Sequence, residues 1–302
     1  MLVLDQRMRA GKRFQRDRSK IFDGEEHSVS TRPLFTGMVT IAAFAVVSLG
    51  AYFAAFERAS RWKAPATPIV SDQPLERTIE QKYGVRLVLG DHKYPIATSH
   101  GLIQATDVNR VDLDRYRKIL DEEFLVYPEE FVRRSRLKRI VLCRGLSFNG
   151  QNRSAVPDLE HDTLYLDVVA GEHKPEYQRR AIHHDFFHIV DFQDDGQLYT
   201  DEQWAKLNSP TFRYGSGGVR MQDDARSGLP WDQPGFLNKY STSGVEEDKA
   251  EIFTYMITCY SIVEERAMTD KLIRKKMAAM KALLAKFSPD MNDDFWSEHC
   301  LQ

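Results

Sequence analysis

The stretch from residue 179 to residue 191 contains side chains whose types and spacing suit a metal site. His184 and His188 are four residues apart, so in a helix they lie on one face, one turn apart. Two imidazoles placed in this way can bind one ion at the N–Zn distance of ~2.0–2.1 Å. Asp185 follows the first histidine, where the H-E-x-x-H pattern has its general-base glutamate. The pattern H-D-x-x-H thus predicts a metal site, and a structural histidine pair is the alternative interpretation.

A third ligand is expected from the acidic segment E-E-D-K-A-E at residues 246–251. Glu247 and Glu251 are four residues apart and share one helical face. Ser243 and Glu246 form a capping-box pair, which leaves Glu247 to complete a His-His-Glu zinc site with a fourth position for water. Glu251 is then placed to accept the second ring N–H of a ligand histidine. The alternative is a solvated acidic first turn, which the helix dipole favours in any case.

The elements that must position these residues indicate an α+β fold. We expect a zincin-like domain with a small mixed sheet that has an edge strand, an active-site helix and a mainly helical C-terminal part. The strand predicted at 163–169 lies directly before the histidine helix and is expected to align an extended peptide across the metal. The expected strands are 85–89, 138–143 and 163–169, and the expected helices are 112–124, 175–193, 246–267 and 271–287.

The N-terminal part predicts attachment to a membrane. Residues 1–33 are polar and basic and are expected to form a disordered cytoplasmic tail. Residues 34–56 carry no charge and are long enough to cross a bilayer as an uncleaved anchor, with a cleaved signal peptide as the alternative. Residues 57–78 read as a linker, and residues 79–302 as one folded domain. The basic tail predicts a cytoplasmic N-terminus and a periplasmic or extracellular domain.

Bulk composition excludes some classes of function. The chain has 302 residues with a formal net charge of −2, so no general affinity for nucleic acid is expected. The three cysteines, Cys143, Cys259 and Cys300, are too widely spaced for a C-x-x-C pair or a disulfide framework.

The histidine motif and the acidic motif together resemble those of a known family. Residues 184–191 (H-D-F-F-H-I-V-D) and residues 247–251 (E-D-K-A-E) are similar to the gluzincin-type zinc metallopeptidases. The closest likeness is to bacterial zinc-binding metallopeptidases with H-E-F-F-H-x-x-D and E-D-x-A-E. A more distant likeness is to the catalytic domains of anthrax lethal factor and the Pro-Pro endopeptidases.

The resemblance implies a role for each matching residue. It implies Zn²⁺ as cofactor and a peptide or protein as substrate. In these enzymes a tyrosine seven residues before the ligand glutamate stabilises the oxyanion, and Tyr240 has that spacing here. The implied set is His184, His188 and Glu247 as metal ligands, Asp185 as general base, Tyr240 as donor to the oxyanion, and Glu251 and Asp191 as supporting residues around the ligands.

One position departs from the family pattern. Asp185 is one methylene shorter than the usual glutamate, so its reach to the attacking water differs. The main hypothesis is therefore a membrane-anchored zinc endopeptidase, and the alternative is a weak or inactive zincin-like module that binds peptides. Two further interpretations carry less weight: His184-Asp185 as the H-D pair of an all-helical phosphohydrolase, and Asp194 as the third ligand.

Overall fold

The computed structural model describes residues 78–90, 93–217 and 233–299. The predicted tail, anchor and most of the linker lie outside these residues, so the predicted domain boundaries and orientation stay predictions. The described residues belong to one compact unit. None of the helices described is both long enough and apolar enough to cross a membrane.

A mixed sheet of seven strands forms one layer of this unit. The path through the sheet is β2-β3-β4-β7-β6, and β1 and β5 also pair with β4. β4 is parallel to β1 and β7, whereas the pairs β2/β3, β3/β4, β4/β5 and β6/β7 are antiparallel. The strands are β1 Arg86–Val88, β2 Ile96–Thr98, β3 Gly101–Asp107, β4 Arg139–Phe148, β5 Gln151–Asn152, β6 Ala155–Asp158 and β7 Thr163–Asp167.

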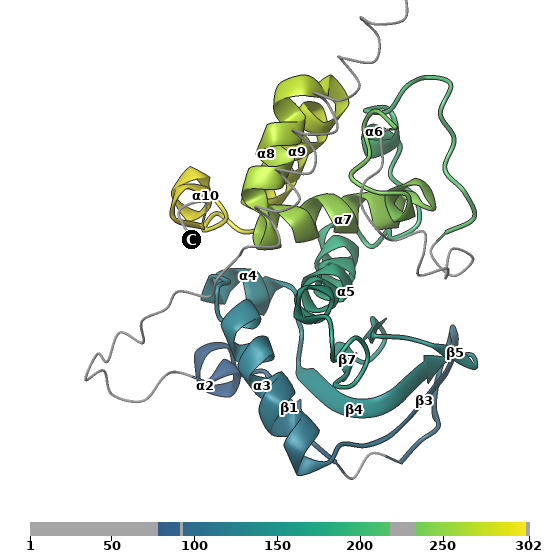
Figure 1. Ribbon diagram of the computed structural model, residues 1–302. Coiled ribbons are helices and arrows are strands. Elements are labelled where there is room, and N and C mark those ends of the chain that lie inside the picture. The colour runs from purple at the N-terminus through teal and green to yellow at the C-terminus, as the bar shows by residue number, and fades with distance from the viewer. Residues whose placement is uncertain (1–77, 91–92, 218–232, 300–302) are drawn as a thin grey trace, which may run out of the picture. The chain divides into compact units, whose positions relative to one another are not determined.

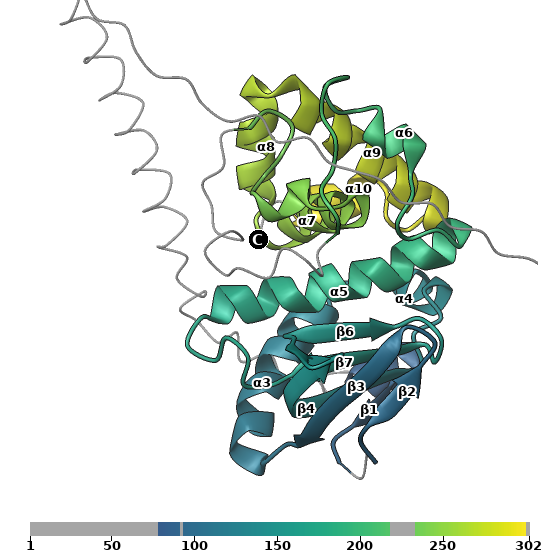
Figure 2. The same cartoon turned by 90° about the vertical axis from the view of Figure 1, so that its right-hand side faces the viewer.

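Helices cover the sheet and make up the C-terminal part. Figures 1 and 2 show α5 between the sheet and the helices α7 to α9, so this helix has protein on both sides. The helices are α2 Ile79–Tyr83, α3 Arg110–Phe124, α4 Glu129–Arg134, α5 Pro175–Asp195, α6 Glu202–Ala205, the 3₁₀ helix η3 Tyr240–Thr242, α7 Val245–Thr258, α8 Tyr260–Thr269, α9 Lys271–Phe287 and α10 Asp293–His299. The α+β class and the helical C-terminal part are confirmed.

The position of α5 explains its composition. Pro175 fits the first turn, where no backbone N–H bond is lost, and Gly196 ends the helix with a φ of 77° that favours glycine. Between these ends Ile182, Phe186 and Phe187 are fully buried in the main core. The helix therefore needs apolar side chains on most of its circumference, and the polar residues that it buries have to find partners.

Three expectations about local structure are wrong. The strand predicted at 163–169 to align an extended peptide is β7, which is completely buried between β4 and β6, so β6 forms the edge of the sheet on this side. The helix predicted at 246–267 is two helices, because Cys259 has a φ of −152° that breaks the helical run. The predicted capping box is absent: Gly244 is the N-cap of α7, and Ser243 instead donates to the carbonyl oxygen of Tyr240.

Candidate metal centre

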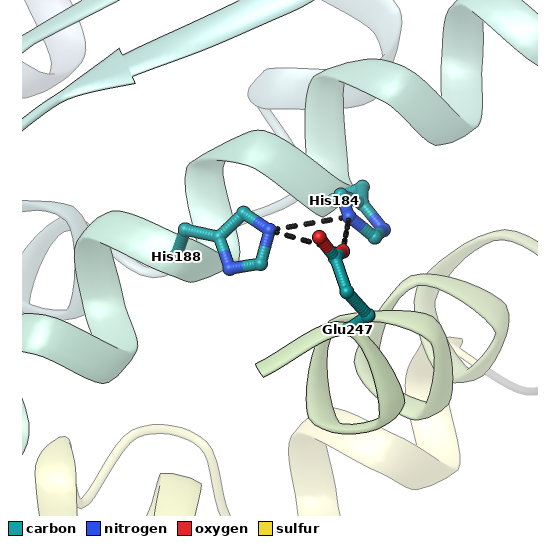
Figure 3. Close-up of side chains that lie close together, drawn as sticks. All are labelled: His184, His188 and Glu247. Carbon is teal, nitrogen blue, oxygen red and sulfur yellow. Dashed lines mark hydrogen bonds and ion pairs between the residues drawn. The ribbon is translucent and has the colours of Figure 1, made fainter. Parts of the chain in front are cut away.

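Three side chains from two helices converge at one point. Nε2 of His184 lies 2.9 Å from Oε2 of Glu247 and 3.2 Å from Nε2 of His188, and Nε2 of His188 lies 3.5 Å from the same Glu247 oxygen. All three residues are buried. Figure 3 shows their polar ends pointing toward one another across the interface of α5 and α7. The prediction that the side chains of these three residues lie close together is confirmed.

The donor set fits a zinc ion. Three ligands at about 2.05 Å from one tetrahedral centre are about 3.3 Å apart, and the observed separations of 2.9, 3.2 and 3.5 Å bracket that value. Two imidazole nitrogens and one carboxylate oxygen are also ligand types that zinc accepts. Within the described part of the chain, His184, His188 and Glu247 are the group of histidines, cysteines and acids that could hold an ion.

Glu251 orients one of the candidate ligands. Its Oε1 lies 2.9 Å from Nδ1 of His184, so Nδ1–H donates to this carboxylate and Nε2 faces the centre. The second oxygen, Oε2, accepts from Nδ2 of Asn238 at 2.5 Å. Glu251 therefore lies where the sequence places it, whereas Asn238 has no motif in the sequence that marks it.

The charges around the centre favour a protonated His184 beside an ionised Glu247. Burial by itself disfavours the charged imidazole, but hydrogen bonds to Glu247 and Glu251 raise the pKa of His184 well above its usual value. Burial likewise opposes ionisation of Glu247, but the hydrogen bonds from His184 and His188 lower its pKa. A cation is thus stabilised at this position, and a metal ion competes with the proton for it.

Asp191 lies three residues after His188 on α5 and is buried. Its Oδ1 forms an ion pair with Lys249, which also pairs with Oδ2 of Asp201 at 2.9 Å. Within the described residues, neither Oδ2 of Asp191 nor Nδ1 of His188 has a hydrogen-bond partner. These two buried atoms are three residues apart on α5, so the supporting role of Asp191 toward His188 stays a prediction.

Asp185 and Tyr240 lie next to the ligands and line the same cleft. The ring centroid of Tyr240 is 5.7 Å from that of His184, and Tyr240 lines the cleft together with Glu247. Burial, followed by the charge of Glu247, raises the pKa of Tyr240 well above its usual value, so its hydroxyl keeps its proton at neutral pH. Burial also raises the pKa of Asp185, which makes its carboxylate a stronger base.

The centre opens into a cleft of about 1280 Å³. One wall is strand β6 and the residues on either side of it, including Ser154, Asp158 and Glu160. Other lining residues come from α5, from the segment that follows it and from the start of α7, as Arg180, Tyr199 and Glu246 show. The cleft thus joins the candidate metal centre to the edge of the sheet, where a chain in extended conformation can pair.

A buried network next to Glu247 holds the surrounding elements in place. Asp248 is fully buried and pairs with the equally buried Lys276 of α9 at 2.6 Å. Its Oδ2 also accepts from Nε1 of Trp204 in α6 and from the hydroxyl of Tyr214. The alternative interpretation of a solvated acidic first turn is therefore wrong for Asp248, which ties α6, the following loop and α9 to the ligand helix.

The two weaker interpretations of the sequence do not fit this arrangement. Asp194 forms an ion pair with Lys286 at 3.2 Å and is not part of the cluster with His184 and His188. The seven-stranded sheet is incompatible with the all-helical fold that the phosphohydrolase interpretation requires.

Comparison with known proteins decides the family. Residues 91–289 match the family described as "putative zinc-binding metallo-peptidase", which is about two thirds of the chain and contains all three candidate ligands. This chain belongs to that zinc-binding metallopeptidase family. Zinc is the metal that the family description names, and the His-His-Glu cluster fits it.

Two further comparisons were made, with solved structures and with curated proteins. A crystal structure from Bacteroides caccae with the same description is similar at 18% identity and a TM-score of 0.44, covering 74% of this chain and 88% of that chain. At this TM-score the assignment rests on the family match. Among curated proteins no significant match is found.

Proposed function

We propose that this chain is a zinc-dependent endopeptidase that hydrolyses peptide bonds in the cleft between β6 and α5. The observation that carries the proposal is the convergence of His184, His188 and Glu247 at 2.9–3.5 Å on the floor of that cleft. An acid and a neutral tyrosine hydroxyl line the cleft beside them. Peptide hydrolysis needs these three kinds of group together.

Each residue has a role that follows from its surroundings. Bound zinc supplies a Lewis acid that activates water and polarises a carbonyl. The carboxylate of Asp185 takes a proton from the attacking water and passes it to the leaving amine nitrogen. The hydroxyl of Tyr240 donates to the substrate carbonyl oxygen as negative charge develops there. Strand β6 offers the backbone groups of its outer edge to a substrate in extended conformation.

Metal content tests the centre directly. Purified full-length protein is supplied with zinc, and bound metal is measured by mass spectrometry together with cleavage of a peptide library. We expect near-stoichiometric zinc and cleavage in the wild type, and loss of both in His184→Ala and Glu247→Ala. His173→Ala is the matched control, because the side chain of His173 is 92% exposed and lies outside the cleft. A wild type that binds no zinc overturns the proposal.

The alternative function is a zincin-like module that binds peptides without cutting them. The shorter acid Asp185 in the position of the family glutamate is the observation that favours it. This alternative expects stoichiometric zinc and saturable peptide binding in the same cleft, but no new N-termini after prolonged incubation. If the wild type cleaves even one peptide and His184→Ala does not cleave it, the protein is an enzyme.

We also propose that residues 34–56 anchor the protein in a membrane, with the catalytic domain on the extracytoplasmic side. The uncharged run and the basic residues that precede it support this proposal. Fractionation of cells that express the full chain, with and without residues 34–56, tests the anchor. Added protease should degrade residues 79–302 in intact spheroplasts or cells if the orientation is correct, and protection there contradicts it.

A further inference from the structure

Arg180 is a cation on the wall of the cleft with no role in the chemistry above. It precedes His184 by four residues on α5, so it lies on the same face, one turn nearer the start of the helix. Its side chain is half-buried and lines the cleft. We propose that Arg180 binds a carboxylate of the substrate on the C-terminal side of the cleaved bond, an inference that rests on the proposed peptidase function.

The guanidinium of Arg180 is available for such a contact. Within the described residues it forms no ion pair, and its Cζ lies 5.5 Å from the ring centroid of Tyr255. Both oxygens of the nearby Glu251 are engaged, by His184 and Asn238. The preceding residue, Arg179, pairs with Glu122 and Glu123 instead. Stacking on a ring orients a guanidinium and leaves its N–H edge free for the two oxygens of a carboxylate.

Contacts between α5 and α7 set the distance of Arg180 from the metal centre. Successive turns of α5 meet successive turns of α7: His188 with Glu247, His184 with Glu247 and Glu251, and Arg180 with Tyr255. Side chains one turn apart on a helix are separated by about 5–6 Å. An extended peptide advances about 3.3 Å per residue. Arg180 is therefore within reach of the first or second substrate residue beyond the bond at the metal.

The direction of β6 determines which side of the bond this is. The first residue of β6, Ala155, is opposite Leu166 near the end of β7, and the preceding Ser154 hydrogen-bonds to the hydroxyl of Tyr177 in the first turn of α5. The start of β6 and the start of α5 thus lie at the same end of the cleft. A peptide that pairs antiparallel with β6, the more stable arrangement, places its C-terminal residues at this end, on the Arg180 side of His184.

The charges along the cleft agree with this direction. Arg153, which directly precedes Ser154, lines the cleft at the same end as Arg180. Asp158 and Glu160 line it at the far end of β6. A carboxylate is thus favoured on the C-terminal side of the bond and disfavoured on the N-terminal side. Two sources have this chemistry, an aspartate or glutamate side chain and the terminal carboxylate of the substrate.

Matched peptides test the inference on full-length, zinc-loaded protein. A cleaved library peptide is remade with glutamate or glutamine at the first and second residues after the bond, each with a free or an amidated C-terminus. We expect kcat/KM to be roughly ten- to a hundredfold higher for the peptide with the carboxylate, mainly through KM, because the contact forms before the chemical step. Preference for glutamate identifies a side chain as the source, and preference for the free terminus identifies the terminal carboxylate.

The variants assign the preference to one residue. Arg180→Gln should remove the preference for the peptide with the carboxylate, and Arg180→Lys should keep part of it, because lysine has the charge without the planar fork. Arg110→Gln is the matched control, since it removes the same charge from a side chain that is 92% exposed and lies outside the cleft. A preference that survives in Arg180→Gln, or that maps to the N-terminal side of the bond, overturns the inference.

A binding assay separates this inference from the proposed function. Asp185→Asn protein loaded with zinc is titrated with labelled library peptides that differ only in carrying glutamate or glutamine, and fluorescence anisotropy reports Kd without any cleavage. If the wild type cuts no peptide but acidic peptides still bind more tightly through Arg180, the peptidase proposal fails and the carboxylate site stands. If glutamate and glutamine peptides bind and are cut equally well, the carboxylate site is overturned and the peptidase proposal stands.

Discussion

Oε1 of Glu251 lies 2.9 Å from Nδ1 of His184, one turn of α7 beyond the candidate ligand Glu247. This contact fixes which nitrogen of His184 faces the metal centre. Such a contact also raises the basicity of the ligand, and its loss typically lowers metal affinity by about ten- to a hundredfold. We therefore expect Glu251 to contribute to zinc binding without touching the ion.

Replacing Glu251 tests this contact. We expect Glu251→Ala to weaken zinc binding by about ten- to a hundredfold, and Glu251→Gln to weaken it less, because its amide oxygen still accepts from Nδ1–H. Competition with a zinc chelator measures both affinities. Glu265→Ala, which removes an exposed acid from α8, is the control. Equal affinities for the wild type and Glu251→Ala contradict the role given to Glu251.

Substitution of Asp185 separates metal binding from catalysis. Asp185→Asn should retain zinc and lower kcat by about 10²- to 10⁴-fold, because the amide cannot accept the proton of the attacking water. Asp185→Glu should preserve or raise activity, since glutamate reaches one methylene further. Steady-state kinetics measure kcat, and mass spectrometry of the same preparations measures bound zinc. A clear loss of activity in Asp185→Glu means that the site is built around the shorter acid.

The hydroxyl of Tyr240 has a separate, testable effect. Tyr240→Phe keeps the ring beside His184 but removes the donor to the substrate carbonyl oxygen. We expect kcat to fall by about 10²- to 10³-fold with little change in KM or zinc content, because the donation strengthens only as charge develops on the oxygen. A rise in KM with kcat unchanged would assign the hydroxyl to substrate binding instead.

His183 predicts a pH dependence of stability. Its ring is fully buried, its Nδ1 accepts from the hydroxyl of Tyr127 at 2.6 Å, and its Nε2–H donates to Glu123 at 2.8 Å. Burial and the charge of Arg179 lower the pKa of His183 to about 3, against 6.5 in a model peptide. The neutral ring is therefore the native form, although Glu123 lies beside it, because Glu123 is itself paired with Arg179.

The sign of this effect follows from the two pKa values. Between pH 6.5 and 3 the unfolded chain binds a proton at this position that the native protein does not, so the free energy of unfolding falls as the pH falls. One such group contributes a slope of at most about 1.4 kcal/mol per pH unit. Urea unfolding at pH 7, 6 and 5 gives the free energy of unfolding, which should change less with pH in His183→Gln than in the wild type. The same change with pH in both proteins would show that His183 takes up its proton in the native state as well.

Local spacing explains what the sequence by itself determined. The positions of His184 and His188, and of Glu247 and Glu251, specify one face of a helix in each case, because residues four apart are neighbours in any α-helix. The candidate zinc ligands and the helical C-terminal part could therefore be predicted without coordinates. The break at Cys259 could not, because no proline or glycine marks it in the sequence, and the structure shows it only as the non-helical backbone of that residue.

Only the tertiary structure decided how the cleft is built around these residues. Strand pairing is non-local, and it placed β7 inside the sheet and β6 at its edge, although the sequence of β7 is the stronger strand signal. The partners of His183, namely Tyr127 and Glu123, are 56 and 60 residues away in the chain. Arg180 likewise acquires its place in the cleft only when α5 packs on α7, since a charged residue on a helix is solvated unless another element covers it.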